Sequence, residues 1–189
     1  ISLILKQAGY TVHLGGNIGT PLLDRIESIR PDDFVVQEIP SSLDGATQKA
    51  YFLSAPAGPK RPLLVSLHVW SGSFESKDPL ASFAKHHGWN YIRPDFRGPN
   101  TSPDSCLSNK VLADIDDAIA FGLRTGNVDA QNIFVVGFSG GAYAALGAYA
   151  RTRHPVKAWL AWAPIADLEA WYWETSARGH VDLSRQILQ

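Results

Sequence analysis

The chain has 189 residues, enough for one domain or slightly more. Hydrophobic residues make up 45% and charged residues 19%, an ordinary globular mix that excludes a disordered or collagen-like chain. The net charge of -1 argues against the strongly basic footprint of a nucleic-acid-binding protein.

Membrane-spanning and cysteine-based structures are excluded by the same inspection. No apolar run reaches the ~18 residues of a transmembrane helix, so no membrane partner is expected. Cys106 is the only cysteine, which rules out an intrachain disulfide and a four-cysteine zinc site. The chain starts at Ile1, has no Met and no signal peptide, so we expect a piece cut from a longer chain. Cysteine usage favours a cytoplasmic location.

The first predicted elements lie before residue 30. Residues 2–8 are typical of the end of a helix, which Gly9 would terminate. Residues 10–14 predict a strand. Residues 21–29 predict a short helix, with Thr20 as its N-cap and Pro21 in its first turn.

A hairpin is predicted next. Residues 34–39 and 48–54 each favour a strand, and the sequence SSLDG between them has the composition of a tight turn. Residues 56–62, with the sequence PAGPKRP, form either a linker or a loop.

From residue 63 onward, apolar strands alternate with helix-period segments. Strands are predicted at 63–69, 91–96, 133–137 and 156–163. Helices are predicted from Asp78 to Gly88, at 111–125, at 141–151 and in the tail from Asp167. In the second helix the apolar stripe comprises Leu112, Ile115, Ile119 and Leu123, with Asp114, Asp116 and Asp117 mostly off it. This alternation predicts an α/β fold with a mostly parallel sheet and flanking helices.

The strongest chemical signal is the segment Gly137-Phe138-Ser139-Gly140-Gly141, between a predicted strand and a predicted helix. A nucleophile elbow needs that context, because a serine on a strained turn tolerates only small neighbours. The backbone N–H of Gly140 is then one oxyanion donor, and the N–H of Trp70, after the strand at 63–69, is the candidate second donor. The alternatives are a glycine-rich turn of a nucleotide-binding fold, and Trp70 with His68 as packing residues.

From about residue 34 to its end, the chain resembles α/β-hydrolases of the prolyl oligopeptidase-like and acetyl esterase group. The motifs that carry the resemblance are PSSLDGATQKAYF, LLVSLHVWSG, WNYIRPDFRGPN, DIDDAIAF, IFVVGFSGGAYAAL and AWAPIADLEAWY. The resemblance implies Ser139 as nucleophile, Gly140 and Trp70 as the oxyanion hole, and Arg97-Gly98 near the site. It also suggests an acyl or sugar pocket, as an alternative to core packing, for Trp159, Trp162, Trp171 and Trp173.

A serine nucleophile needs a histidine base and an acid, which this family carries after later strands. Only about fifty residues follow Ser139, so we expect the hydrolase part to be incomplete at its C-terminus. Asp167 and His180 occur in the family's order, but thirteen residues are too few for the intervening elements. The other histidines of this part are His68, His86, His87 and His154.

Residues 1–38 resemble the central domain of Mur ligases, most closely the ligase that adds D-glutamate to UDP-N-acetylmuramoyl-alanine. The segment GGNIG at 15–19 matches that family's substrate loop, and Glu38 matches a position that helps to hold magnesium. The ATP-binding loop of the family is absent from the chain. A strand-to-helix turn is therefore the preferred interpretation of the glycines.

These observations predict two segments, a Mur-ligase-like segment at 1–38 and an α/β-hydrolase-like domain at 39–189. The leading hypothesis is a serine hydrolase acting on a small-molecule ester or a peptide, without a metal or organic cofactor, and inactive if the chain lacks a working histidine and acid. The alternatives are a non-catalytic chimera or fragment, and a UDP-sugar-peptide binder that uses Gly16, Asn17 and Glu38. The N-terminal piece supplies a strand, a helix and another strand, which predicts an N-terminal βαβ unit. We also expect apolar surface at an exposed sheet edge, covered by this βαβ unit or by a second copy in a homo-oligomer.

Overall fold

The computed structural model describes residues 34–188. The elements predicted at 2–8, 10–14 and 21–29 lie outside the described residues. The described part contains one sheet of six strands. These are β1 (Val35–Pro40), β2 (Thr47–Leu53), β3 (Arg61–Leu67), β4 (Asn90–Pro94), β5 (Val128–Phe138) and β6 (Ala158–Trp162).

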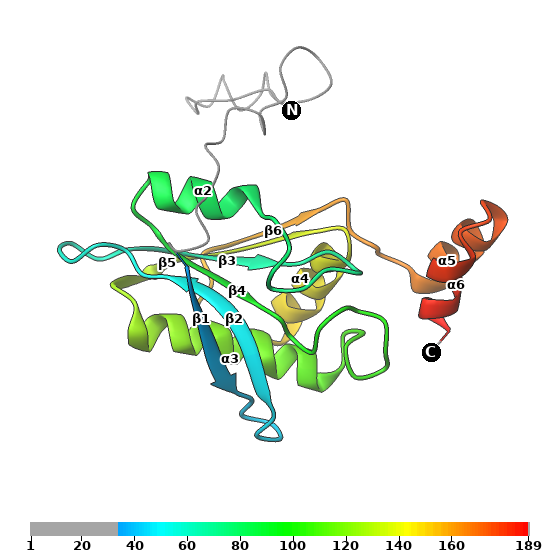
Figure 1. The fold of residues 1–189 in the computed structure, drawn as a ribbon, viewed down its shortest axis with the longest axis horizontal. Coiled ribbons are helices and arrows are strands. Elements are labelled where there is room, and N and C mark those ends of the chain that lie inside the picture. The colour runs from blue at the N-terminus through cyan, green and yellow to red at the C-terminus, as the bar shows by residue number, and fades with distance from the viewer. Residues whose placement is uncertain (1–33, 189) are drawn as a thin grey trace, which may run out of the picture.

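The strands lie in the order β1-β2-β4-β3-β5-β6 (Figure 1). The pairs β3–β4, β3–β5 and β5–β6 are parallel, whereas β1–β2 and β2–β4 are antiparallel. Because β3, β4, β5 and β6 all run in the same direction, their carboxyl ends lie at one edge of the sheet. The predicted α/β fold is confirmed, and an antiparallel hairpin extends its parallel part.

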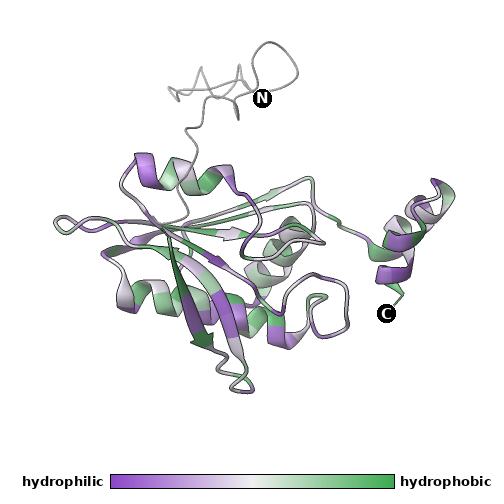
Figure 2. Ribbon diagram, viewed as in Figure 1, coloured by the Kyte–Doolittle hydropathy of each residue, from purple (hydrophilic) through white to green (hydrophobic). Residues whose placement is uncertain are grey.

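Helices lie on both faces of the sheet (Figure 1). Helix α2 (Pro79–His86) covers part of one face, and α3 (Asn109–Thr125) and α4 (Gly140–Arg151) cover the other. Helices α5 (Leu168–Ala177) and α6 (Val181–Ile187) pack on each other beyond the end of β6. Figure 2 shows hydrophobic and hydrophilic residues interspersed along both the strands and the helices.

Helix starts follow the capping signals in the sequence. The Asp78 carboxylate accepts a hydrogen bond from the Leu80 N–H at 2.9 Å, and Pro79 begins α2. The Ser108 hydroxyl accepts from the Lys110 N–H at 3.1 Å and starts α3. Asp167 caps α5 in the same way, accepting from the Ala170 N–H at 3.0 Å. The predicted helices in residues 78–88, 111–125, 141–151 and the tail are thus present.

The expectation that the acidic residues of α3 lie off its buried side is wrong for two of them. Asp114 and Asp116 are buried, with 3% and 5% of their surface exposed. Asp116 accepts hydrogen bonds from the Thr152 hydroxyl and the Arg153 Nε, and Asp114 accepts from Arg97. Burial is tolerated because each carboxylate has charged or hydroxyl partners, and those partners are distant in sequence.

Candidate active site

Ser139 occupies the junction between β5 and α4. Its φ of 54° and ψ of −116° place a non-glycine residue in the left-handed half of backbone space. Such a conformation costs on the order of 1–2 kcal/mol and persists only where the surroundings enforce it. One restraint is the Ser139 N–H, which donates to the Trp162 carbonyl at 3.0 Å. The side chain is half-buried at the carboxyl edge of the sheet.

The glycines around Ser139 are required by close backbone approach. A Cβ on Gly137 would overlap the Gly141 carbonyl, and a Cβ on Gly141 would overlap the Leu67 carbonyl. A Cβ on Gly140 would overlap the backbone of Trp70. The turn that carries Ser139 is therefore pressed against the loop that follows β3, which places Gly140 next to the backbone of Trp70.

Trp70 is fixed from several sides. Its side chain is 4% exposed, and its carbonyl accepts from the Asn100 N–H at 2.8 Å. Its indole Nε1 donates to the Gln186 Oε1 at 3.0 Å, and its ring lies 4.9 Å from that of Trp171 in an edge-to-face contact. Helices α5 and α6 thus hold the loop after β3. Sequence reasoning missed Asn100 and Gln186, since nothing local to either residue points to Trp70.

The backbone N–H groups of Gly140 and Trp70 are the two candidate oxyanion donors. Within residues 34–188, neither donates a hydrogen bond to another group. Gly140 begins α4, so its N–H is among those a helix leaves without an internal partner. The N-terminus of α4 also contributes a partial positive charge beside Ser139. Two such donors can stabilise a developing oxyanion.

No histidine of the described part bonds to the Ser139 hydroxyl, which makes no hydrogen bond within residues 34–188. His68 is fully buried, its ring nitrogens lie 2.9 Å from the Val69 and Asp95 carbonyls, and its ring stacks on Phe96. Burial lowers the pKa of His68, while its hydrogen bonds to the two carbonyl oxygens act in the opposite direction. It is a packing residue at the end of β3.

The remaining histidines have other environments. The Nε2 atom of His154 lies 2.9 Å from the Asp116 carbonyl oxygen, and the Nδ1 atom of His87 lies 2.8 Å from the Phe83 carbonyl oxygen. His86 and His180 are exposed, at the ends of α2 and before α6. Asp167 is occupied as a helix cap, so the pair Asp167 and His180 has no contact that would make it an acid and a base. His13 lies outside the described residues.

Other titratable groups near α4 are not general bases at neutral pH. Burial, and then the neighbouring Cys106, raise the pKa of Tyr143 to about 12, so its hydroxyl stays protonated. Burial also raises the pKa of the Cys106 thiol, against a hydrogen bond with Tyr143.

Arg97 lies in the loop after β4 and links three parts of the fold. Its guanidinium bonds to the Asp114 carboxylate at 2.7 Å and to that of Asp44 at 2.8 Å. These contacts tie the hairpin turn, the loop after β4 and α3 together. The side chain is occupied by those two carboxylates.

The tryptophans predicted as pocket or core divide between several environments. Trp171 contacts Trp70, and Trp159 packs on the core beneath α4 with its ring 6.0 Å from that of Tyr149. Trp162 and Trp173 are each 62% exposed. Core packing therefore accounts for Trp159, whereas Trp171 borders the candidate site.

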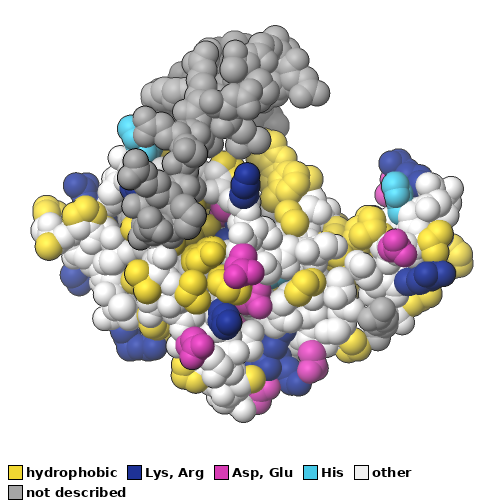
Figure 3. Space-filling view, viewed as in Figure 1, with side chains coloured by type: hydrophobic (Ala, Val, Ile, Leu, Met, Phe, Trp, Pro, Cys, Tyr) yellow, Lys and Arg dark blue, Asp and Glu magenta, His cyan; other side chains and the backbone are white. Residues whose placement is uncertain are grey.

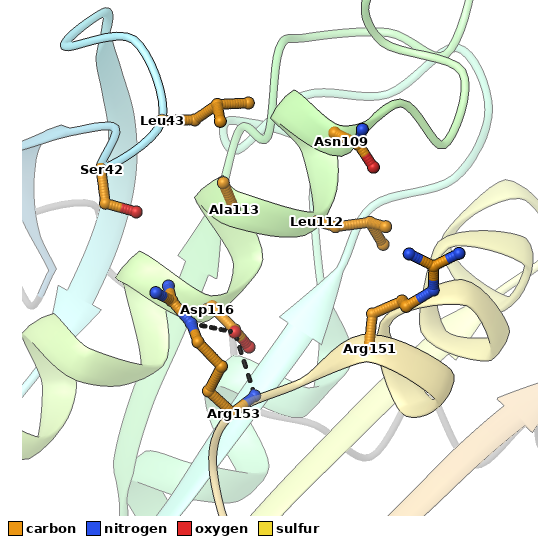
Figure 4. Close-up of a pocket in the computed structure, with 8 residues that line it drawn as sticks. All are labelled: Ser42, Leu43, Asn109, Leu112, Ala113, Asp116, Arg151 and Arg153. Atoms are coloured by element: carbon orange, nitrogen blue, oxygen red, sulfur yellow. Dashed lines mark hydrogen bonds and ion pairs between the residues drawn. The ribbon is translucent and has the colours of Figure 1, made fainter.

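A cleft of about 320 Å³ lies elsewhere, between the hairpin turn, α3 and the end of α4 (Figure 4). Figure 4 shows Arg153 bonded to Asp116, with Arg151 on the opposite side of Leu112. Arg151 ends the 12-residue helix that begins beside Ser139. That length corresponds to about 18 Å at 1.5 Å per residue, so the cleft is separate from the candidate active site.

Glu38, predicted as a magnesium ligand by the Mur ligase resemblance, is exposed on β1 opposite Lys49. Within residues 34–188, no group of three or more metal-ligating side chains is found. The glycines at 15–19 lie outside the described residues. The described part also contains no helix long and apolar enough to cross a membrane.

No family model matches the sequence. A 38-residue stretch, 20% of the chain, is 60% identical to UDP-N-acetylmuramoylalanine--D-glutamate ligase of Clostridium tetani, but spans only 8% of that enzyme. An esterase of Pyrococcus furiosus is similar in structure, with a TM-score of 0.62 and 20% identity over 82% of this chain and 60% of its own. The acylaminoacyl peptidase of Pyrococcus horikoshii gives a TM-score of 0.59 at 17% identity, over 74% of this chain and 24% of its own.

The described part has the α/β-hydrolase fold, as its similarity to an esterase and a peptidase shows. The other similarity is confined to about a fifth of the chain and belongs to a ligase. The chain therefore combines likenesses to two unrelated kinds of enzyme, as the sequence motifs predict.

Proposed function

We propose that Ser139 is an acyl-accepting nucleophile, with the N–H groups of Gly140 and Trp70 as its oxyanion hole. The observation that carries this proposal is the strained backbone of Ser139 at a strand-to-helix junction, beside two N–H groups without internal partners. A strained serine with a free hydroxyl and two nearby donors is the arrangement that acyl transfer needs. Esterases and peptidases among the structural neighbours support the same reaction class.

In the proposed reaction, the Ser139 Oγ forms a bond to the carbonyl carbon of an ester or peptide as its proton passes to a base. The carbonyl electron pair moves to the oxygen, where the two N–H groups stabilise the negative charge. The alcohol or amine then leaves with a proton, and water releases the acid. The described residues contribute the nucleophile and the oxyanion hole.

The base limits the rate of this reaction. Since no described histidine contacts Ser139, the described residues supply no base to it, and with a base from solvent alone such a site retains only the catalysis of the oxyanion hole. We therefore expect slow acylation that added imidazole accelerates, because a free imidazole can take the proton.

The test is labelling with a fluorophosphonate probe, with and without imidazole. We expect slow phosphonylation of one serine, faster with imidazole, and lost in Ser139→Ala. Ser176→Ala is the matched control, because Ser176 is exposed on α5 outside the site, and it should label like the unchanged protein. Labelling that survives in Ser139→Ala would overturn the proposal. A folded sample that never labels, even with imidazole, would establish the alternative of a non-catalytic fragment.

A further inference from the structure

Three large hydrophobic side chains are exposed together on one face of the sheet. Phe138 is 52% exposed, Leu160 50% and Trp162 62%. Phe138 lies opposite Trp162 in the β5–β6 register, and Leu160 is two residues before Trp162, so all three project from the same face. We call these three residues the open face. Figure 3 shows hydrophobic side chains gathered over this edge of the sheet, beside α2.

The open face continues a packed cluster. Val136 lies opposite Leu160, and it belongs with Phe134 to the hydrophobic cluster beneath α2. The side chain of Trp159, which points to the other face, packs against the core beneath α4. Strand β6 is thus covered on the face that carries Trp159 and exposed on the face that carries Leu160 and Trp162. A contiguous apolar patch of this kind is typical of an interaction surface.

The chain enters the described fold on the same face. Phe34 packs on the ring of Tyr91 at 5.7 Å, and both belong to the cluster that contains Phe134 and Val136. Tyr91 lies in β4, and β3, β5 and β6 follow it in the sheet. Three strand spacings of about 4.8 Å separate β4 from β6, a distance of roughly 14 Å.

The segment before Phe34 has the composition to cover such a face. Residues 1–23 include one Lys or Arg, Lys6, no Asp or Glu, and several Leu, Ile and Val residues. Residues 24–33 carry the other charged side chains of the segment. Ten residues can span up to about 33 Å, which exceeds the distance from β4 to β6. The charged stretch can therefore bridge to the open face.

We propose that residues 1–23 dock on the open face, joined to the sheet by residues 24–33. The apolar side chains of the segment cover Phe138, Leu160 and Trp162. A second copy is the competing occupant, but a tethered segment acts at an effective concentration in the millimolar range for a short linker. Docking is therefore intramolecular and independent of protein concentration. The inference does not depend on the reactivity of Ser139.

The test measures thiol accessibility in the full chain. Cys106→Ser removes the only cysteine, and Leu160→Cys then places a thiol on the open face. The matched control is Leu146→Cys, since Leu146 is 43% exposed on α4, beyond the opposite face of the sheet. We expect a maleimide to modify position 160 many-fold more slowly than position 146, equally at low and high protein concentration. Trp162→Cys is a second reporter should Leu160→Cys fold poorly.

One further variant and one crosslinking experiment identify what covers the thiol. The double substitution Leu22→Asp and Leu23→Asp places charges in the segment, and we expect it to restore fast modification at position 160. A photocrosslinker on that thiol should join it to residues 1–23 within monomeric protein. Equal rates at positions 160 and 146 would overturn the proposal, as would protection that rises with protein concentration and survives the aspartate substitutions, which is the signature of a second copy.

Discussion

Two regions of the molecule are held by different forces. One is the turn around Ser139, and the other is the corner, by which we mean Arg97 with its partners Asp44 and Asp114. The turn, residues 137–141, is fixed by backbone pressed against backbone, and no charged side chain takes part. The corner is fixed by one guanidinium, which joins Asp114 of α3 to Asp44 of the hairpin turn. Steric fixation responds to a single methyl group, whereas electrostatic fixation responds to the loss of a partner and to pH.

The largest effect is expected at the turn, for Gly141→Ala. The new Cβ would overlap the Leu67 and His68 carbonyl region, and backbone atoms cannot give way as a flexible side chain can. We expect a loss of about 3 kcal/mol or more in the free energy of unfolding, measured by urea denaturation. Gly179→Ala is the control, because its Cβ would meet nothing within 4 Å and only its φ of +74° is unfavourable. Its loss should stay near 1 kcal/mol, and equal losses would contradict steric fixation.

At the corner, Asp114→Ala should be the most damaging single change. The Asp114 side chain is fully buried and the Arg97 side chain is 11% exposed, so the substitution leaves a guanidinium without its buried partner. We expect a loss of about 3 kcal/mol, at the lower end for breaking a buried ion pair. Asp104→Ala removes an exposed partner of Lys110 and should cost less than about 1 kcal/mol. Comparable urea midpoints for the two variants would show that the corner is not held by its ion pairs.

The contrast explains what the sequence could predict. The turn is local, so the spacing of Gly137, Ser139 and Gly141 between a strand and a helix is readable directly. The order of strands and helices is readable for a similar reason, because periodicity and caps act over a few residues. The predicted ends of the elements still differ from the observed ones, since β5 begins five residues before the predicted start at residue 133.

The ion pairs of the corner and the hydrogen bond between Trp70 and Gln186 could not be predicted from the sequence. Arg97 lies 53 residues from Asp44 and Trp70 lies 116 residues from Gln186, and no local pattern connects them. Asp114 was expected off the apolar stripe of α3 because of its position along the helix, and the arginine that makes its burial acceptable lies in another element. Long-range polar partners depend on the assembled fold.

A smaller effect of opposite sign is expected for Ser139→Gly. Glycine adopts the φ of 54° without strain, although it gains more entropy in the unfolded chain. The relief of about 1–2 kcal/mol, less that entropy, should leave a stabilisation of about 1 kcal/mol in urea unfolding, with fluorophosphonate labelling lost. Ser176→Gly, within α5, should instead destabilise the protein. A destabilised Ser139→Gly variant would mean that the hydroxyl contributes to folding.

The smallest effect is a pH dependence at the corner. The hydrogen bonds from Arg97, and then from the Ala46 N–H, lower the pKa of Asp44 from 3.8 to about 2. A carboxyl with a lowered folded-state pKa stabilises the fold above its unfolded pKa, and that contribution fades as the pH falls from about 4 to about 2. Asp44→Asn should therefore unfold at lower urea than the unchanged protein at neutral pH, with the gap closing across that interval. Because other carboxyls such as Asp129 titrate in both proteins, the difference between the two urea midpoints isolates Asp44. A gap that stayed constant from pH 5 to about 2 would mean that the hairpin turn is held without the Arg97 ion pair.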